Sequence, residues 1–300
     1  MTYQGYLDGK KPIDDRSLNR NVFETLRSNL DGRGELKVLE LGSGIGTMVA
    51  RGLEWGLLDR AEYTAVDLSP ENAAFAPRYL GRWGASTGYR VERNGHQTVE
   101  LSRDGQRVRV RLCTADALKF VSEQKEKWDL LIAHSFLDLI DVSSNLGSLL
   151  GLLRPGGMFY FSLVFDGLTA LRPAIDPEWD ERIMCTYHRN MDRRTNSSKK
   201  YRSCETGRQV LDLLTSDSDV DLLSAGSSDW TVCPRSGSYT DEERAFLKFI
   251  LQTMFGALKE EGEEEEVLRR WLELRYEHID SGKLIYIAHQ IDMVGSVRGQ

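Results

Sequence analysis

A glycine-rich turn follows the first strongly apolar segment of the chain. Residues 38–47 read VLELGSGIGT, so glycines stand at 42, 44 and 46, directly after Leu41. Glycine has no Cβ atom, and such a turn lets the backbone bend sharply and approach a ligand closely. The spacing departs from the dinucleotide fingerprint G-x-G-x-x-G, because glycine falls at 46 and threonine at 47. A plain turn between a strand and a helix is the alternative explanation.

Two carboxylates follow later predicted strands. Asp67 ends the segment 62–67, 21 residues after Gly46, and Asp116 follows a strand predicted to end near residue 113. The first can accept two hydrogen bonds from a ribose diol, as in nucleotide-binding α/β folds, and the second can accept one from the amine of a purine. Each could instead cap a helix, although Ser69 is available for that role beside Asp67. The coincidence at successive strand ends indicates a nucleoside-containing ligand.

The glycine turn lacks a cation that could serve a pyrophosphate. Glu40 lies just before the turn, and the first basic residue after it is Arg51. A pyrophosphate ligand benefits from a helix N-terminus and often from a nearby arginine or lysine. A sulfonium amino acid tolerates this acidity better, so a nicotinamide-dependent oxidoreductase is disfavoured.

Apolar periodicity predicts alternating strands and helices, which is typical of a parallel sheet. Asn94-Gly95 and Asp104-Gly105 are hairpin turn signals and predict a three-stranded meander. The other predicted strands span residues 37–41, 62–67, 128–134, 158–164, 220–227 and 284–293. Beyond the helices that follow the first two strands, helices are predicted near residues 16–30, 117–125, 143–153, 207–216, 241–259 and 264–280.

These elements suggest a core with two additions. We expect residues 1–35 to form an N-terminal helical cap, and residues 36–165 and 207–300 to form the core, with a hairpin enlargement at 88–113. Residues 166–206 interrupt the alternation after the carboxyl end of a strand. Ligands of open α/β sheets bind at that edge, so the insertion is predicted to be a lid.

Five segments together resemble the class I S-adenosylmethionine-dependent methyltransferases. They read ELGSGIG at 40–46, AVDLS at 65–69, TADA at 114–117, WDLLI at 128–132 and LRPGG at 153–157. The resemblance covers residues 36–165. It implies a Rossmann-like α/β sheet of seven strands, mostly parallel with an antiparallel last strand that includes residues 284–288. It also implies S-adenosyl-L-methionine as cofactor and methyl transfer as activity.

The resemblance assigns roles to particular residues. The glycine turn would contact the methionine part of the cofactor, Asp67 would bind the ribose hydroxyls, and Asp116 would bind the adenine amine. Glu40 would support the glycine turn or the amino end of the cofactor. His134 would lie beside the sulfonium and is the candidate catalytic residue. The cofactor-binding candidates are Glu40, Gly42, Ser43, Gly44, Gly46, Asp67, Leu68, Asp116, Ala117 and His134. The substrate-binding candidates are Ser135, Asp138, Tyr187, His188 and Arg189.

The acceptor is predicted to be a small molecule. Residues 133–138 read AHSFLD, without the Asp/Asn-Pro-Pro-aromatic motif of base-amino methyltransferases. The chain has 46 acidic and 39 basic residues, a net charge of −7, which disfavours nucleic acid. Residues 181–208 carry eight basic and three acidic side chains, a local charge of +5. They could form a rim for an anionic acceptor or a solvated helix face.

Two other functions stay open on the same fold. Aminopropyl transfer would need an acid-rich pocket after the fourth core strand, and a non-catalytic module would bind S-adenosylmethionine without turnover. Four widely spaced cysteines show no C-x-x-C pair, so we expect no metal site and reduced thiols. We also expect no membrane span, because no run of about 18 apolar residues occurs, and no signal peptide. A cytoplasmic location is therefore predicted.

Overall fold

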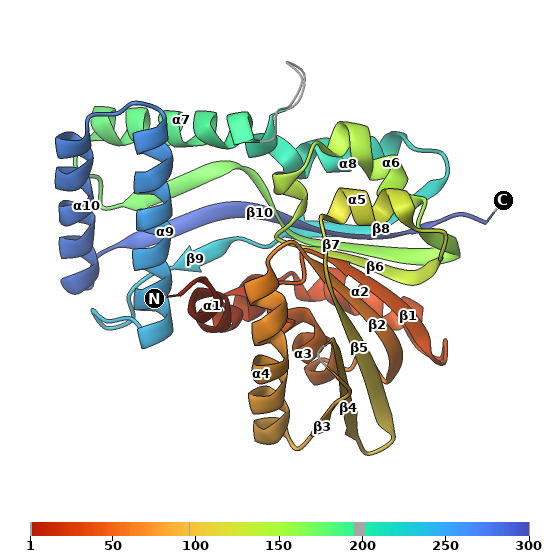
Figure 1. Ribbon diagram of the computed structural model, residues 1–300. Helices are drawn as coiled ribbons and strands as arrows, with labels where there is room; N and C mark the ends of the chain where they lie inside the picture. The colour runs from red at the N-terminus through yellow and green to blue at the C-terminus, as the bar shows by residue number, and fades with distance from the viewer. Residues whose placement is uncertain (1, 96, 195–201, 300) are drawn as a thin grey trace.

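A mixed sheet of ten strands runs through the part of the molecule that the computed structural model describes, residues 2–95, 97–194 and 202–299 (Figure 1). The strands are β1 (Leu36–Leu41), β2 (Arg60–Asp67), β3 (Arg90–Arg93), β4 (Thr98–Arg103), β5 (Gln106–Thr114), β6 (Trp128–His134), β7 (Leu153–Arg172), β8 (Val220–Ser227), β9 (Trp230–Val232) and β10 (Ile285–Val297). Their order is β3-β4-β5-β2-β1-β6-β7-β10-β8, with β9 also paired to β10.

The direction of the strands confirms the predicted sheet. β1, β2, β5, β6 and β7 pair in parallel, whereas β10 is antiparallel to both β7 and β8. The predicted meander is also present, since β3 pairs with β4 and β4 with β5 in antiparallel fashion. Asp104 and Gly105 both have positive φ, 51° and 90°, as the Asp-Gly hairpin signal requires.

Helices cover both faces of this sheet. They are α1 (Tyr3–Ser17), α2 (Arg20–Leu30), α3 (Thr47–Glu54), α4 (Pro70–Thr87), α5 (Ala117–Glu123), α6 (Val142–Leu150), α7 (Pro177–Arg194), α8 (Thr206–Ser216), α9 (Asp241–Glu260) and α10 (Glu265–Asp280). Val38 of β1 joins the core beneath α2, α3 and α4, and Leu39 joins the opposite core beneath α6 and α8. Because both faces are buried, apolar residues occupy four of the six positions of β1.

A third core lies beyond the central sheet, where β7 and β10 continue as a long ribbon. β7 was expected to end at Val164 but pairs with β10 as far as Arg172, opposite Ile285. The first part of the predicted lid is therefore a strand, because β10 supplies it with a backbone partner. α7, α9 and α10 cover this ribbon and stand together in Figure 1. Whether residues 166–206 act as a lid stays a prediction.

The N-terminal region contains two helices where one was predicted over residues 16–30. α2 matches the amphipathic pattern, and Asn19 caps it by accepting from the backbone N–H groups of Asn21 and Val22. α1 was missed because Gly5, Gly9 and Pro12 interrupt the helical signal of its sequence. α1 packs against α9 and β9 near the carboxyl edge of the sheet.

Asp292 joins α2 to the sheet. Its carboxylate, which is 0% exposed, accepts from the N–H of Asn19 and of Leu163, each at 2.8 Å. Asp292→Ala would leave both donors without this partner, and we expect the free energy of unfolding to fall by about 3 kcal/mol. Urea denaturation measures this loss. Asp221→Ala breaks a surface ion pair with Arg298 and should lower the free energy of unfolding by less than about 1 kcal/mol. Equal losses of stability in the two variants would contradict the role of Asp292 as a buried acceptor for α2 and the sheet.

Candidate functional site

The site lies where the order of the strands reverses. The chain passes from β1 to β2 on one side, and β6 pairs with β1 on the other, so the loops after β1 and β6 diverge at the carboxyl edge. Two adjoining cavities open there and share Gly42, Asp67 and Phe136. The narrow cavity has a volume of about 350 Å³ and the wide cavity about 680 Å³.

The glycine turn forms the floor between these two cavities. Gly42 has φ +72°, and a Cβ atom there would lie 2.7 Å from Cδ2 of Phe136, so only glycine fits. Gly42 and Ser43 donate their N–H groups to the carbonyl of Val66 at 2.9 and 3.0 Å. Gly44 lines the narrow cavity, whereas Gly46 caps the start of α3 and does not line either cavity. The turn is thus held against the end of β2.

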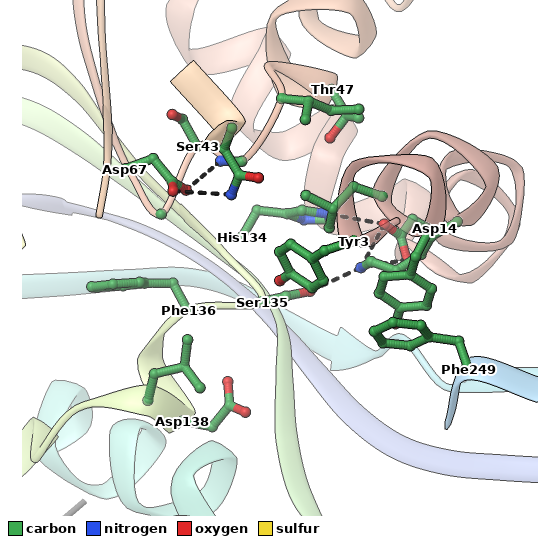
Figure 2. Close-up of a pocket in the computed structure, with 18 of the residues that line it drawn as sticks. Tyr3, Asp14, Ser43, Thr47, Asp67, His134, Ser135, Phe136, Asp138 and Phe249 are labelled. Carbon is green, nitrogen blue, oxygen red and sulfur yellow. Dashed lines mark hydrogen bonds and ion pairs between the residues drawn. The ribbon is translucent and has the colours of Figure 1, made fainter. Parts of the chain in front are cut away.

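Asp67 fixes the glycine turn as well as facing both cavities. One carboxylate oxygen accepts from the N–H of Gly44 at 2.7 Å (Figure 2). The other accepts from the N–H of Ser69 at 2.9 Å and from the side-chain amide of Asn72 at 3.0 Å. Ser69, not Asp67, caps α4, so the helix-cap alternative for Asp67 is excluded.

Asp116 caps a helix and also lines the wide cavity, and its contact with adenine stays a prediction. Its Oδ1 accepts from the N–H of Lys119 at 2.9 Å and caps α5, and the residue also lines the wide cavity beside Ala117. Leu68 and Leu139 line the same cavity with exposed fractions of 70% and 65%. Apolar side chains this exposed are available to cover a flat ring.

Asp14 of α1 stands at the centre of a buried polar cluster on the wall of the narrow cavity. One carboxylate oxygen lies 2.8 Å from Nζ of Lys10 and 3.3 Å from Nε2 of His134, and the other accepts from Nε1 of Trp230 at 2.9 Å. Burial acts to raise the pKa of Asp14, but the Lys10 ammonium and the His134 hydrogen bond outweigh it and hold the pKa well below its usual value.

His134, which was predicted to lie beside the sulfonium of the cofactor, lines the narrow cavity, but protein groups engage both of its ring nitrogens. Because Asp14 is an ionised acceptor, Nε2 carries the hydrogen, and Nδ1 accepts from the hydroxyl of Ser162 at 2.9 Å. Burial lowers the pKa of His134 to about 4, so the ring is neutral near pH 7. In this arrangement neither nitrogen is free to take a proton from a ligand.

Glu40 is a second buried acid on the same wall. It accepts a hydrogen bond from the hydroxyl of Tyr63 at 2.7 Å. Burial raises its pKa to about 8, because the hydrogen bond from Tyr63 and the charge of Arg51 offset the effect of burial only in part. Glu40 is therefore largely protonated near pH 7 until a positive charge comes close to it.

A small cavity of about 110 Å³ adjoins the narrow one and shares Ser135, Asp138, Trp230 and Ile250 with it. Tyr187 of α7 lines this small cavity, so three of the predicted substrate residues come together. The other two do not, because His188 packs against the ring of Phe165 and Arg189 is exposed, and neither lines these cavities.

The basic segment 181–208 does not form a rim in its described part. Arg193 pairs with Glu261, Arg202 with Asp192 and Arg208 with Asp166, at 3.0, 3.1 and 2.9 Å. Arg182 and Arg189 are exposed, and residues 195–201 lie outside the described residues. Among the described residues that line the three cavities, Lys10 is the one cation.

The sequence analysis missed the contribution of two helices to the site. α1 and α9 supply part of the wall of the narrow cavity, and Figure 2 shows Tyr3, Asp14 and Phe249 among the side chains that line it. The missed lining residues include Tyr3, Tyr6, Lys10, Asp14, Asn72, Trp230, Phe249 and Thr253. A signal did exist in α1, because spacings of three and four residues place Tyr3, Tyr6, Lys10 and Asp14 on one helical face.

Among the described residues, no group of three or more His, Cys, Asp or Glu side chains could hold a metal ion. None of the helices in the described ranges is both long and apolar enough to cross a membrane.

No family model and no curated protein matches this sequence. Among solved structures, the chain is similar to an S-adenosylmethionine-dependent methyltransferase from Thiobacillus denitrificans in complex with S-adenosyl-L-homocysteine, with 18% identity, 94% of this chain and 93% of that chain covered, and a TM-score of 0.48. A methyltransferase from Geobacter sulfurreducens in the same complex has 18% identity, with 94% of this chain and 93% of that chain covered and a TM-score of 0.46. YjhP from E. coli has 14% identity, with 98% of this chain and 99% of that chain covered and a TM-score of 0.47. The Rossmann-like sheet itself is established by the strand order described above.

The lowered pKa of His134 makes the free energy of unfolding depend on pH. Its folded pKa of about 4 lies below the ordinary value of 6.5, so the unfolded chain binds more protons between these values and stability falls as pH falls. Between pH 7 and 5 the wild-type protein should lose about 2 kcal/mol relative to His134→Gln. Urea denaturation at both pH values measures the difference. Buried acids with a raised pKa make the fold more stable as pH falls, but they do so equally in the wild type and in His134→Gln. Parallel pH profiles would contradict this, because they would show that His134 keeps its ordinary pKa in the fold.

Proposed function

We propose that this protein binds S-adenosyl-L-methionine across the wide and narrow cavities and transfers its methyl group to a small molecule in the small cavity. One observation carries the proposal. The glycine turn, Asp67 and Asp116, at the carboxyl ends of β1, β2 and β5, line two cavities that meet at Gly42 and Asp67. A nucleoside joined to an amino acid has two parts that these cavities would separate.

The wide cavity suits the adenosine. Asp116 would accept from the adenine amine, and Asp67 would accept from the ribose hydroxyls beyond the bonds it already makes to the turn. Leu68 and Leu139 would cover the faces of the purine, which explains why two large apolar side chains are left exposed at this edge.

The narrow cavity suits the charged end of the cofactor. Lys10 supplies a cation for the carboxylate, and Glu40 supplies an acid for the ammonium group. An ammonium group beside Glu40 would favour the charged form of that carboxyl, which burial alone disfavours. The residues present therefore fit a zwitterionic amino acid.

The bound cofactor would supply a methyl group on a sulfonium, and the chain would supply alignment. Tyr3, Tyr6, Phe136 and Phe249 line the narrow cavity, and the rings of Tyr6 and Phe249 stack at 3.8 Å. Aromatic faces attract a cation and exclude water from it. Alignment of the two reactants by such walls can lower a barrier by as much as ~7–11 kcal/mol.

The two alternatives make different demands on the site. Aminopropyl transfer would need several unpaired acids after β6, whereas Asp138 is the one lining acid there with an unpartnered buried oxygen among the described residues. A non-catalytic binding module would need no acceptor space, yet the small cavity adjoins the place where the methionine part would lie.

Calorimetric titration with S-adenosyl-L-methionine and S-adenosyl-L-homocysteine tests the proposal. We expect both to bind with dissociation constants below millimolar, and binding of neither would refute the proposal. Incubation of the protein with a radiolabelled methyl donor and a small-metabolite extract then separates the enzyme from the binding module. Labelled product supports methyl transfer, and its absence despite tight binding supports the module.

Asp67→Ala should weaken binding of S-adenosyl-L-homocysteine by about 1–3 kcal/mol, or roughly 5- to 150-fold. The variant loses charge-assisted hydrogen bonds to the ribose and the anchor of Gly44. Asp59→Ala is the matched control, because Asp59 is exposed just before β2, at the opposite end of that strand. Calorimetry measures the affinity of both variants for S-adenosyl-L-homocysteine. An unchanged affinity in Asp67→Ala would show that the ribose does not bind at Asp67.

A further inference from the structure

The small cavity holds two buried hydrogen-bond acceptors that lack a partner among the described residues. They are Oδ1 of Asp138, in the short turn after β6, and Oε1 of Gln290, in β10. Gln290 is only 3% exposed. A buried polar atom without a partner costs about 1–3 kcal/mol, so two in one cavity call for an explanation. A ligand that donates hydrogen bonds would supply it.

The backbone around this cavity is irregular in a way that directs side chains into it. β10 shifts its register against β7 between Ala288 and Gln290, and such bulges re-aim the side chains beside them. Leu163 and Ser135, which also line the cavity, have positive φ values of 52° and 50°. Non-glycine residues hold such angles only where their surroundings enforce them. Asp292 does so for Leu163 by accepting from its N–H.

The remaining walls select against charged acceptors. Aromatic and aliphatic side chains surround the two acceptor atoms, and they include Phe165, Tyr187, Met191, Trp230, Ile250 and Tyr286. No cation lines this cavity among the described residues, and an ionised Asp138 would repel a carboxylate or phosphate there. Flat rings favour an aromatic molecule, and the unmatched acceptors favour hydroxyl groups on it.

We propose that the small cavity takes an uncharged aromatic acceptor bearing hydroxyl groups, with one hydroxyl donating to Asp138 and a second donating to Gln290, and that Asp138 is the base of the reaction. The proposal rests on the proposed function. As the acceptor oxygen forms its bond to the methyl carbon, the carbon–sulfur bond breaks with its electron pair left on sulfur. The hydroxyl proton passes to the carboxylate of Asp138.

The position of Asp138 agrees with this role. It lines both the small and the narrow cavity, so its carboxyl group lies between the acceptor space and the space proposed for the methionine part. Burial raises the pKa of Asp138 to about 6, which makes it a stronger base than an exposed aspartate, while it remains mostly ionised at pH 7. Asp14, by contrast, is committed to Lys10, His134 and Trp230.

Binding is tested first, with catechol, phenol, benzylamine and benzoate as probes. Saturation-transfer NMR on the protein loaded with S-adenosyl-L-homocysteine should detect catechol and phenol, with catechol the tighter of the two. Asp138→Asn and Gln290→Met should each weaken catechol at least fivefold while leaving the affinity for S-adenosyl-L-homocysteine within about twofold. Preference for benzylamine or benzoate, or failure of both hydroxylated probes to bind, would overturn the proposal.

Kinetics then separate the two residues. Asp138→Asn should lower kcat for methylation of catechol by about 10²- to 10⁴-fold, because a general base is lost. Gln290→Met should raise KM several-fold with kcat unchanged. Asp212→Asn, an exposed aspartate of α8, is the matched control and should leave both constants unchanged. Catechol that binds but is not methylated by the wild-type protein, or a kcat unaffected in Asp138→Asn, would overturn the assignment of the base.

The two proposals fail in different ways. If the wild-type protein binds neither S-adenosyl-L-methionine nor S-adenosyl-L-homocysteine, the proposed function itself is refuted. If either nucleoside binds but the hydroxylated probes do not, only the class of acceptor is refuted. Circular dichroism of each variant shows whether it is folded, and Gln290→Met is expected to be at least as stable as the wild type because a buried unpaired oxygen is removed.

Discussion

One buried carboxylate, Asp14, holds together the region where the cavities meet. Its partners come from three parts of the chain, since Lys10 belongs to α1, His134 ends β6 and Trp230 begins β9. A buried charge is costly unless it is paired and hydrogen-bonded, and these contacts together satisfy both of its oxygens. The N-terminal helix is thereby held at the carboxyl edge of the sheet, where it supplies part of the wall of the narrow cavity.

Burial alone does not set the charge of the acids in this region; their partners do. Asp14 has a cation beside it and keeps a low pKa, whereas burial raises the pKa of Glu40 to about 8 and of Asp138 and Asp292 to about 6. Asp292 is a structural acceptor for two backbone donors, and Asp138 has an oxygen with no described partner. Asp14 therefore stays ionised near neutral pH, whereas Glu40, Asp138 and Asp292 have pKa values close enough to neutral pH to gain or lose a proton.

The three cavities share walls, so they follow one another in the order wide, narrow and small. Gly42 and Asp67 lie between the wide and the narrow cavity, and Ser135 and Asp138 lie between the narrow and the small one. A ligand in the narrow cavity would therefore form part of the wall of each neighbour. The loops after β1 and β6 supply three of these four residues, because the strand order reverses between those two strands.

The sequence alone determined the sheet, the meander and the positions of Gly42, Asp67 and Asp116, because strand periodicity, hairpin turns and glycine turns are local properties of the chain. It also placed Ser135 and Asp138 after β6. Only the tertiary structure decided that α1 lines the site, that β7 runs on to Arg172, and that Arg193, Arg202 and Arg208 pair with acids. The first two features depend on contacts between residues more than a hundred positions apart, because α1 contacts His134 and Trp230, and the end of β7 pairs with β10. The arginine pairs join residues at least ten positions apart, and the period of a single helix or strand does not reveal such pairs.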